Sequence, residues 1–152
     1  MKNSIRISSV KNINRSSSIS EILKLNSDKF PKRIFIYDHT SEEVKKISYS
    51  DFNYYVDCCC NLFEDLKIKR RDIISIILDN SLAYLIIYFA SIRYGTILNP
   101  LPTTLGNKII REKILEVNPR IIFKDKNIEF NVKKFNKKIV KIQNCRNFIS
   151  QL

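Results

Sequence analysis

Cysteine and histidine are the residues of this chain with the widest chemical range, and their spacing decides whether they can form a site. Three of the four cysteines are consecutive, Cys58-Cys59-Cys60, and the fourth, Cys145, lies far along the chain. Neighbouring residues on a helix point about 100° apart, so three adjacent thiols cannot surround one metal ion. The chain has no Cys-x-x-Cys pair and a single histidine, His39. We therefore predict no metal site and interpret the thiols as small, reduced core residues.

The segment Thr-Thr-Leu-Gly-Asn-Lys, residues 103–108, is the second chemical candidate because it weakly imitates a phosphate-binding loop. A backbone cradle for phosphate needs several glycines, and the whole chain has two. Thr104 is placed to begin the next helix. We therefore predict a turn into a helix here, and we assign no catalytic, cofactor-binding or metal-binding residue to this chain.

Charge is the unusual bulk property of the sequence. The chain has 27 basic and 15 acidic residues, a net charge of +12, and the excess sits at its two ends. Basic ends can bind nucleic acid or an acidic partner, which leaves a noncatalytic basic α/β binding module as the alternative function. Lys outnumbers Arg 18 to 9, whereas base and phosphate readout favours Arg. We therefore do not expect nucleic-acid binding.

Residues 1–18 are basic, rich in serine and free of acidic side chains, and we predict that they form a disordered tail. The same composition occurs in organellar transit peptides. Because no apolar leader is present and the thiols are interpreted as reduced, we expect the cytoplasm, with an organelle as the alternative.

Two helices are predicted in the first half of the chain. Ser18 and Glu21 have the spacing of a capping box, so a helix follows to about Lys29. Its expected inward residues are Ile19, Ile22 and Leu23. Ser50 is placed to cap a second helix over residues 51–66, whose apolar residues recur at steps of three and four. These are Phe52, Tyr55, Val56, Cys59, Phe63 and Leu66.

Two further helices are predicted after residue 80. Asn80 or Ser81 caps a helix over residues 82–94, and Gly95 ends it. Thr104 opens the next helix, which runs to about Val117 before an Asn-Pro stop. Its expected inward residues are Ile109, Ile110, Ile114 and Val117.

Apolar runs between these helices predict strands over residues 33–38, 72–78, 96–99 and 120–124. A short extended piece is expected at 45–50, and a further strand at 137–142 within the Lys-rich extension 126–152. Alternation of strands and helices with short connections implies an α/β fold with a mostly parallel sheet flanked by helices. We place this α/β subdomain at residues 19–125.

The apolar stretch at residues 77–102 raises the question of a membrane span, which needs about 20 apolar residues. The best window, residues 73–92, contains Asp79 and Asn80 well inside it. An Asp deep in a bilayer costs about 2.5–3.5 kcal/mol, whereas the same residues favour a turn from a strand into a helix. We therefore predict buried α/β core and no membrane span.

With these elements placed, the chain resembles the adenylate-forming enzymes, the family of acyl-CoA synthetases and luciferase-like ligases. Residues 47–66, ISYSDFNYYVDCCCNLFEDL, are similar to the family opening LTYxEL. Residues 70–105 resemble its pattern GDxVxxxLxNxxxxxxxxxAxxxxGxxxxPLxPxxT. The matching positions are Asp72, Asn80, Ala90, Gly95, Pro100, Leu101, Pro102 and Thr104. The similarity runs from about residue 19 to residue 125.

This resemblance implies a ligase that uses ATP and magnesium to join AMP to a carboxylate and then passes the acyl group to a thiol such as coenzyme A. The family's phosphate loop, Tyr-x-x-Thr-Glu segment, ribose-binding Asp and catalytic Lys lie beyond the matched region. The chain therefore resembles an incomplete N-terminal subdomain, from a truncated or a split enzyme. We expect no catalysis and no cofactor binding by this chain alone, and we expect the remainder of the ligase as its partner.

Within the resemblance, the matched residues have structural roles. Asp72 starts a strand, Asn80 caps a helix, Gly95 stops one and Pro100 shapes a loop, beside Leu101 and Thr104 of the same motif. The family commonly has Gly where Lys67 stands and Pro-Gly where Arg70-Arg71 stand. A left-handed Lys costs about 1–2 kcal/mol, so either the turn is rebuilt or the sequence has drifted. A lone subdomain also leaves a sheet edge uncovered, which predicts poor solubility or a need for a partner.

Overall fold

A computed structural model describes residues 18–39, 43–128, 138–142, 148–149 and 152. The predicted disordered tail, apart from Ser18, and much of the Lys-rich extension lie outside these residues. Elements follow one another in the order α1 (Ile19–Lys29), β1 (Ile34–Asp38), β2 (Lys45–Ser48), α2 (Tyr49–Asp65), β3 (Ile73–Ile77), α3 (Leu82–Tyr94), β4 (Ile97–Pro100), α4 (Asn107–Val117), β5 (Ile121–Asp125) and β6 (Lys138–Ile142).

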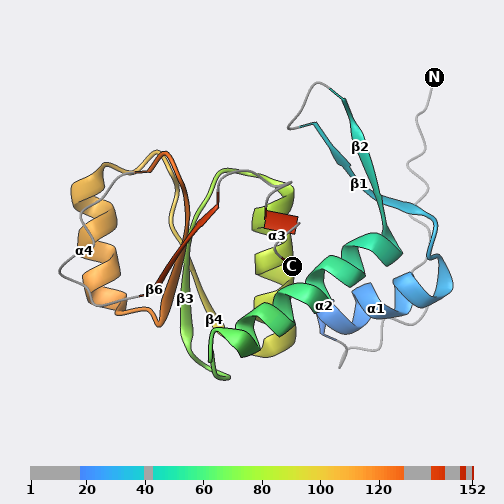
Figure 1. Ribbon diagram of the computed structural model, residues 1–152, viewed down its shortest axis with the longest axis horizontal. Coiled ribbons are helices and arrows are strands. Elements are labelled where there is room, and N and C mark those ends of the chain that lie inside the picture. Colours follow the sequence, from blue (N-terminus) through green and yellow to red (C-terminus); the bar gives the residue numbers. More distant parts are fainter. Residues whose placement is uncertain (1–17, 40–42, 129–137, 143–147, 150–151) are drawn as a thin grey trace, which may run out of the picture.

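Four strands form one parallel sheet in the order β4-β3-β5-β6. In Figure 1 this sheet stands between α4 on one face and α2 with α3 on the other. The predicted α/β fold with a mostly parallel sheet flanked by helices is confirmed. The strand predicted at residues 137–142 is also confirmed, as β6 (Lys138–Ile142).

The hairpin of β1 and β2 does not join that sheet. The two strands pair antiparallel in a separate two-stranded sheet. Their connection is too short for a parallel crossover, which needs a dozen or more residues, so they pair as a hairpin. The strand predicted at residues 33–38 is therefore present but belongs to a different layer.

Alternating side chains of β3 supply both faces of the sheet. Ile74 and Ile76 are fully buried in the larger core cluster with α2 and α3. Ile77 is fully buried in a second cluster, with Ile110 and Ile114 of α4. This two-sided burial explains why the strand is an almost unbroken run of isoleucine.

The helix starts differ from two predictions. Ser48, rather than Ser50, caps α2, with its side chain accepting from the Asp51 N–H at 3.1 Å and the Asp51 carboxylate accepting from the Ser48 N–H at 3.2 Å. α4 begins at Asn107 with Gly106 as its cap, so Thr104 does not open it. The chain makes a turn first, in which the Leu105 N–H bonds the Pro102 carbonyl at 3.2 Å.

Two inward faces were also predicted wrongly in part. In α1, Leu23 is buried, but Ile19 and Ile22 are 52% and 37% exposed, because Ser20 and Ser27 face the neighbouring helices instead. In α4, Ile110 and Ile114 are buried and Ile109 is 45% exposed. The predicted face of α2 is confirmed at its four buried residues, Phe52, Val56, Cys59 and Phe63.

The turn between α2 and β3 keeps left-handed geometry without glycine. Lys67 has φ 56° and Arg71 has φ 68°. The Lys67 N–H bonds the Glu64 carbonyl and the Arg71 N–H bonds the Gly95 carbonyl, both at 2.8 Å. Lys67 and Arg71 thus adopt the left-handed conformation that favours glycine, at a cost of about 1–2 kcal/mol each. Gly95, with φ 81°, ends α3 as predicted.

Among the described residues, no helix combines the length and the apolar composition that a bilayer crossing needs. The apolar helix α3 has 13 residues and packs against α2 and β4 in the core. This agrees with the prediction of buried α/β core for this stretch.

The capping of α2 by Ser48 can be tested by mutation. Ser48→Ala removes an oxygen that satisfies the Asp51 N–H and should lower the free energy of unfolding by about 1 kcal/mol. The matched control is Ser50→Ala, at an exposed position inside the helix, where we expect a change within about 0.5 kcal/mol. Chemical denaturation of both variants measures the difference. A larger loss for Ser50→Ala would contradict the observed helix start.

Candidate functional site

The carboxyl ends of the parallel strands are the first place to search for function. In open α/β sheets, ligands bind where neighbouring strands lead to connections in opposite directions. Here β3 leads to β4 on one side and β5 leads to β6 on the other, so this position lies between β3 and β5. The loop after β3 contributes Asp79 and Asn80, and the turn after β4 contributes Thr103.

Side chains join these loops to one another. The Thr103 hydroxyl donates to the Asp79 carboxylate, which links the ends of β3 and β4.

Ser81, rather than Asn80, caps α3, and its Oγ accepts from the Tyr84 N–H at 3.2 Å. The sequence predicted either Asn80 or Ser81 as the cap of α3, and the structure shows that it is Ser81. The role of Asn80 as a helix cap is wrong.

A cleft of about 500 Å³ lies between the start of α3 and the β1–β2 hairpin. Its lining consists of Ile36, Tyr37, Asp38, His39, Asn80, Ser81, Leu82, Tyr84 and Leu85. Asp38 is buried at 5% exposure, whereas Tyr37 and His39 are exposed. The cleft is therefore an apolar hollow with a few polar groups, which is the usual composition of a small-molecule site.

Aromatic contacts hold the hairpin wall of this cleft in place. The Phe35 ring of β1 stacks on Tyr49 with centroids 4.7 Å apart. It also contacts Phe52 of α2 at 5.1 Å and Phe89 of α3 at 6.4 Å. Sequence reasoning missed this cluster because the ring of Phe35 in β1 meets residues from two other elements, α2 and α3.

The described residues do not build a phosphate cradle. None of the described residues that line the cleft is Lys or Arg. In the segment 103–108, Gly106 has an ordinary extended backbone, and a Cβ there would meet nothing within 4 Å. Neither the backbone conformation nor the protein neighbours therefore require glycine at this position. The observed turn matches the prediction of a turn into a helix.

The cysteines of α2 diverge as predicted. Cys59 is fully buried, and the Cys60 thiol points to the Ala90 carbonyl oxygen of α3 at 3.8 Å. Burial raises the pKa of the Cys59 thiol well above its usual value and raises the pKa of Cys60 to about 11. Within the described part of the chain, no three His, Cys, Asp or Glu side chains cluster as metal ligands would. Cys145 lies outside the described residues.

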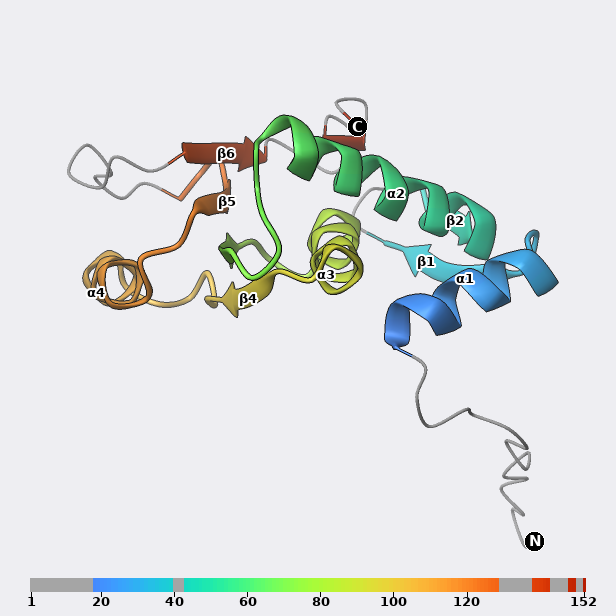
Figure 2. The ribbon, with the colours of Figure 1, turned by 90° about the horizontal axis from the view of Figure 1, so that it is seen from below.

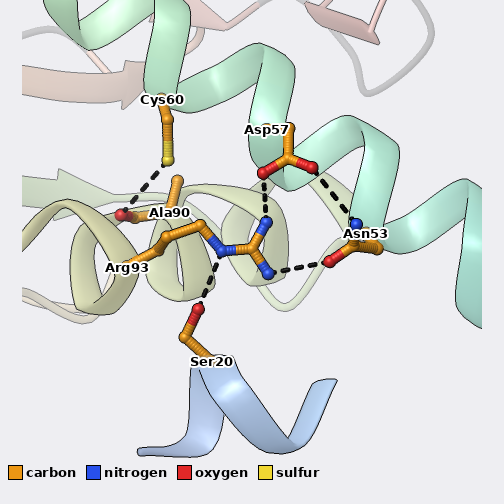
Figure 3. Close-up of polar contacts among 6 residues, drawn as sticks. All are labelled: Ser20, Asn53, Asp57, Cys60, Ala90 and Arg93. Atoms are coloured by element: carbon orange, nitrogen blue, oxygen red, sulfur yellow. Dashed lines mark hydrogen bonds and ion pairs between the residues drawn. The ribbon is translucent and has the colours of Figure 1, made fainter. Parts of the chain in front are cut away.

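Arg93 forms a polar junction that the sequence reasoning did not find (Figure 3). From the last turn of α3, its Nε donates to Ser20 Oγ of α1 at 2.8 Å, and one Nη donates to Asn53 Oδ1 of α2 at 2.8 Å. The other Nη pairs with the Asp57 carboxylate. The guanidinium thus joins three helices. Because its N–H groups bond these partners, we assign Arg93 a structural role.

The residues of the predicted motif occupy distinct structural positions. Asp72 precedes β3, and its carboxylate accepts from the Lys69 N–H at 2.8 Å. Gly95 ends α3, Pro100 is the last residue of β4, and Leu101 is buried in the cluster under α4. Thr104 is exposed in the turn before α4. None of the six predicted positions, including Asn80, is brought into a shared catalytic constellation, and their assignment as structural motif residues stays a prediction.

Several solved structures share the fold of this chain. The Klebsiella oxytoca NpsA N-terminal subdomain in complex with 3-hydroxybenzoyl-AMSN has a TM-score of 0.70 at 16% identity, over 88% of this chain and 31% of that chain. VinN has a TM-score of 0.77 at 13% identity, over 89% and 36%. A Mycobacterium tuberculosis fatty acyl CoA synthetase has a TM-score of 0.74 at 10% identity, over 86% and 28%. The likeness shows a shared fold, and this chain spans about one-third of each relative.

The sequence itself identifies the family of this chain. The family described as AMP-binding enzyme matches residues 23–149. The chain therefore belongs to the AMP-binding enzyme family, and the resemblance drawn from its motifs is confirmed. Among curated protein sequences, none matches this chain.

The junction at Arg93 predicts a measurable stability difference between two ion pairs. Arg93→Met removes bonds to three partners on two other helices and should lower the free energy of unfolding by about 2–3 kcal/mol. Lys113→Met is the control, because Lys113 pairs only with Glu116 one turn away on the surface of α4, and such a pair is worth about 0.5 kcal/mol. Equal losses in chemical denaturation would contradict the junction.

The raised pKa of Cys60 predicts the pH dependence of its alkylation. In a Cys58→Ser/Cys145→Ser background, iodoacetamide should modify Cys60 about a hundredfold more slowly than an ordinary thiol at pH 8, because the thiolate is the nucleophile. The rate should rise about tenfold per pH unit from pH 7 to 10, since a raised pKa leaves the thiol protonated over this range. Mass spectrometry measures the rate, with circular dichroism as the control for folding. A plateau below pH 9 would refute the assignment.

Proposed function

We propose that this chain forms the N-terminal subdomain of an ATP-dependent acid–thiol ligase and acts together with the rest of that enzyme. The observation that carries the proposal is the family match over residues 23–149. Its support is the parallel sheet β4-β3-β5-β6, which accompanies the likeness to the longer adenylate-forming structures. The remainder of the enzyme would come from the same polypeptide or from a second one.

In the proposed whole enzyme, ATP and magnesium activate a carboxylate as an acyl adenylate, and a thiol such as coenzyme A accepts the acyl group. The described residues do not fit a triphosphate, because the cleft lining lacks Lys and Arg and Gly106 forms no cradle. We therefore assign no chemical step to them. Their proposed contribution is to hold a wall of the enzyme, with the Asp79–Thr103 link fixing the loops at the carboxyl ends of β3 and β4.

We further propose a cytoplasmic location and reduced cysteines. The support is that Cys59 is fully buried and the partly buried Cys60 lies against the Ala90 carbonyl, so neither thiol needs an oxidised partner for packing. Thiols of this kind persist in a reducing compartment.

Carboxylate-dependent exchange between ATP and pyrophosphate tests the proposal. The chain alone should give no exchange, whereas the chain joined to, or mixed with, the polypeptide encoded directly downstream should give exchange with a panel of carboxylic acids. The matched control is the downstream polypeptide without this chain, which should be inactive because it lacks the subdomain.

Two results would contradict this expectation. Exchange by the chain alone would show that the described residues hold ATP after all. No exchange by the combination with any acid would remove the ligase assignment. Steeply salt-dependent binding of an oligonucleotide by the chain would instead support the alternative of a basic binding module.

A further inference from the structure

The strand β4 is an edge of the parallel sheet with one hydrogen-bonded neighbour. Figure 2 shows β4 at one end of the sheet and β6 at the other. Toward β3, the Ile97 N–H bonds the Asp72 carbonyl at 2.9 Å and the Leu101 N–H bonds the Ile76 carbonyl at 2.8 Å. In the described chain, no strand pairs with the other side of β4.

The geometry of the peptide bond fixes which groups face outward from β4. In a trans peptide, the carbonyl of one residue points opposite to the N–H of the next. The carbonyls of Thr96 and Pro100 therefore point away from β3, because the N–H groups of Ile97 and Leu101 point toward it. By the alternation of a parallel ladder, both backbone groups of Leu98 also point outward.

This outer edge is rich in acceptors and poor in donors. Pro100 has no N–H, and the Thr96 N–H already bonds the Ser91 carbonyl at 3.0 Å. The edge therefore offers one outward donor, at Leu98, against three outward carbonyls, at Thr96, Leu98 and Pro100. A strand that pairs here must bring free N–H groups of its own.

Side-chain composition distinguishes this edge from the opposite one. β6 carries the exposed Lys141, and lysine on an edge strand discourages pairing with other chains. Residues 96–100 have no charged side chain, and Ile97 is 50% exposed. The sheet is thus protected against pairing at β6 and unprotected at β4.

A second copy of the same edge fits poorly. Two copies of β4 related by a two-fold axis would pair antiparallel and exchange two hydrogen bonds at Leu98. The next pair would match Thr96 with Pro100, where one N–H is already used and the other does not exist. A foreign strand with free N–H groups satisfies all three carbonyls, so the edge favours a different partner.

We propose that the outer edge of β4 is the docking edge for an extended, uncharged strand from the polypeptide that completes the enzyme. This rests on the proposed function and names the surface where the two parts meet. The solved relatives have chain to supply such a strand, because this chain covers only 31% of the NpsA subdomain and 36% of VinN. The strand adds to the sheet next to β4 and covers Ile97.

The test uses the complex of the full chain with the polypeptide encoded directly downstream. Ile97→Lys places a charge on the open edge at an exposed position, and Leu115→Lys is the control at a 57% exposed position on α4. We expect Ile97→Lys to weaken the complex by at least about tenfold and Leu115→Lys to change it less than about twofold. Binding is measured by titration calorimetry.

Hydrogen exchange by NMR gives a second readout on the unmodified protein. The Leu98 amide should exchange rapidly in the isolated chain and at least about a hundredfold more slowly in the complex. The Leu101 amide, which bonds Ile76, should be protected in both states. Circular dichroism checks that both variants are folded.

Each outcome decides the proposal. An active complex in which Leu98 stays unprotected and the two variants behave alike overturns the docking edge and leaves the proposed function intact. Protection of Leu98 in the isolated chain, constant or rising with its concentration, overturns it in favour of an edge already covered or of self-pairing. Absence of any complex or exchange activity overturns the docking edge and the proposed function together.

Discussion

The rest of the structure depends on β3 being enclosed on all four sides. Strands β4 and β5 flank it, and helices cover both of its faces. A strand in this position must have every backbone group hydrogen-bonded and apolar side chains of both parities. Ile74, Ile76 and Ile77 supply the apolar side chains. The buried Ser75 is the polar exception, and its hydroxyl oxygen accepts a 2.9 Å hydrogen bond from the Asn99 amide. Both helical layers are positioned against this strand.

The helix α3 positions the candidate site through contacts at both of its ends. The first turn of the helix, capped by Ser81, forms one wall of the cleft, and the hairpin opposite is held by the contacts of Phe35. At the other end, Arg93 joins α3 to α1 and α2 (Figure 3). The polar chemistry of the described chain therefore serves to position elements.

The two edges of the described sheet differ in their side chains and backbone groups. Its two apolar clusters are buried on either face of the sheet. At β4, however, three carbonyls face outward with one N–H, and no charge discourages pairing. The exposed Lys141 of β6 discourages pairing at the opposite edge. The sequence predicted an uncovered sheet edge, and among the described strands β4 is the edge with the outward carbonyls.

Local patterns were sufficient for much of this fold. The apolar run of β3, the capping box at Ser18 and the glycine stop at Gly95 each depend on neighbours in sequence, so they could be predicted without coordinates. The choice of Ser48 over Ser50 was local too, because Ser48 and Asp51 form a capping box. The exposure of Ile19 and Ile109 and the separation of the hairpin from the main sheet depended on how distant elements pack. So did the cleft and the junction at Arg93, whose partner Ser20 lies 73 residues away. Periodicity identifies a face, but only the packed helices and strands decide what that face meets.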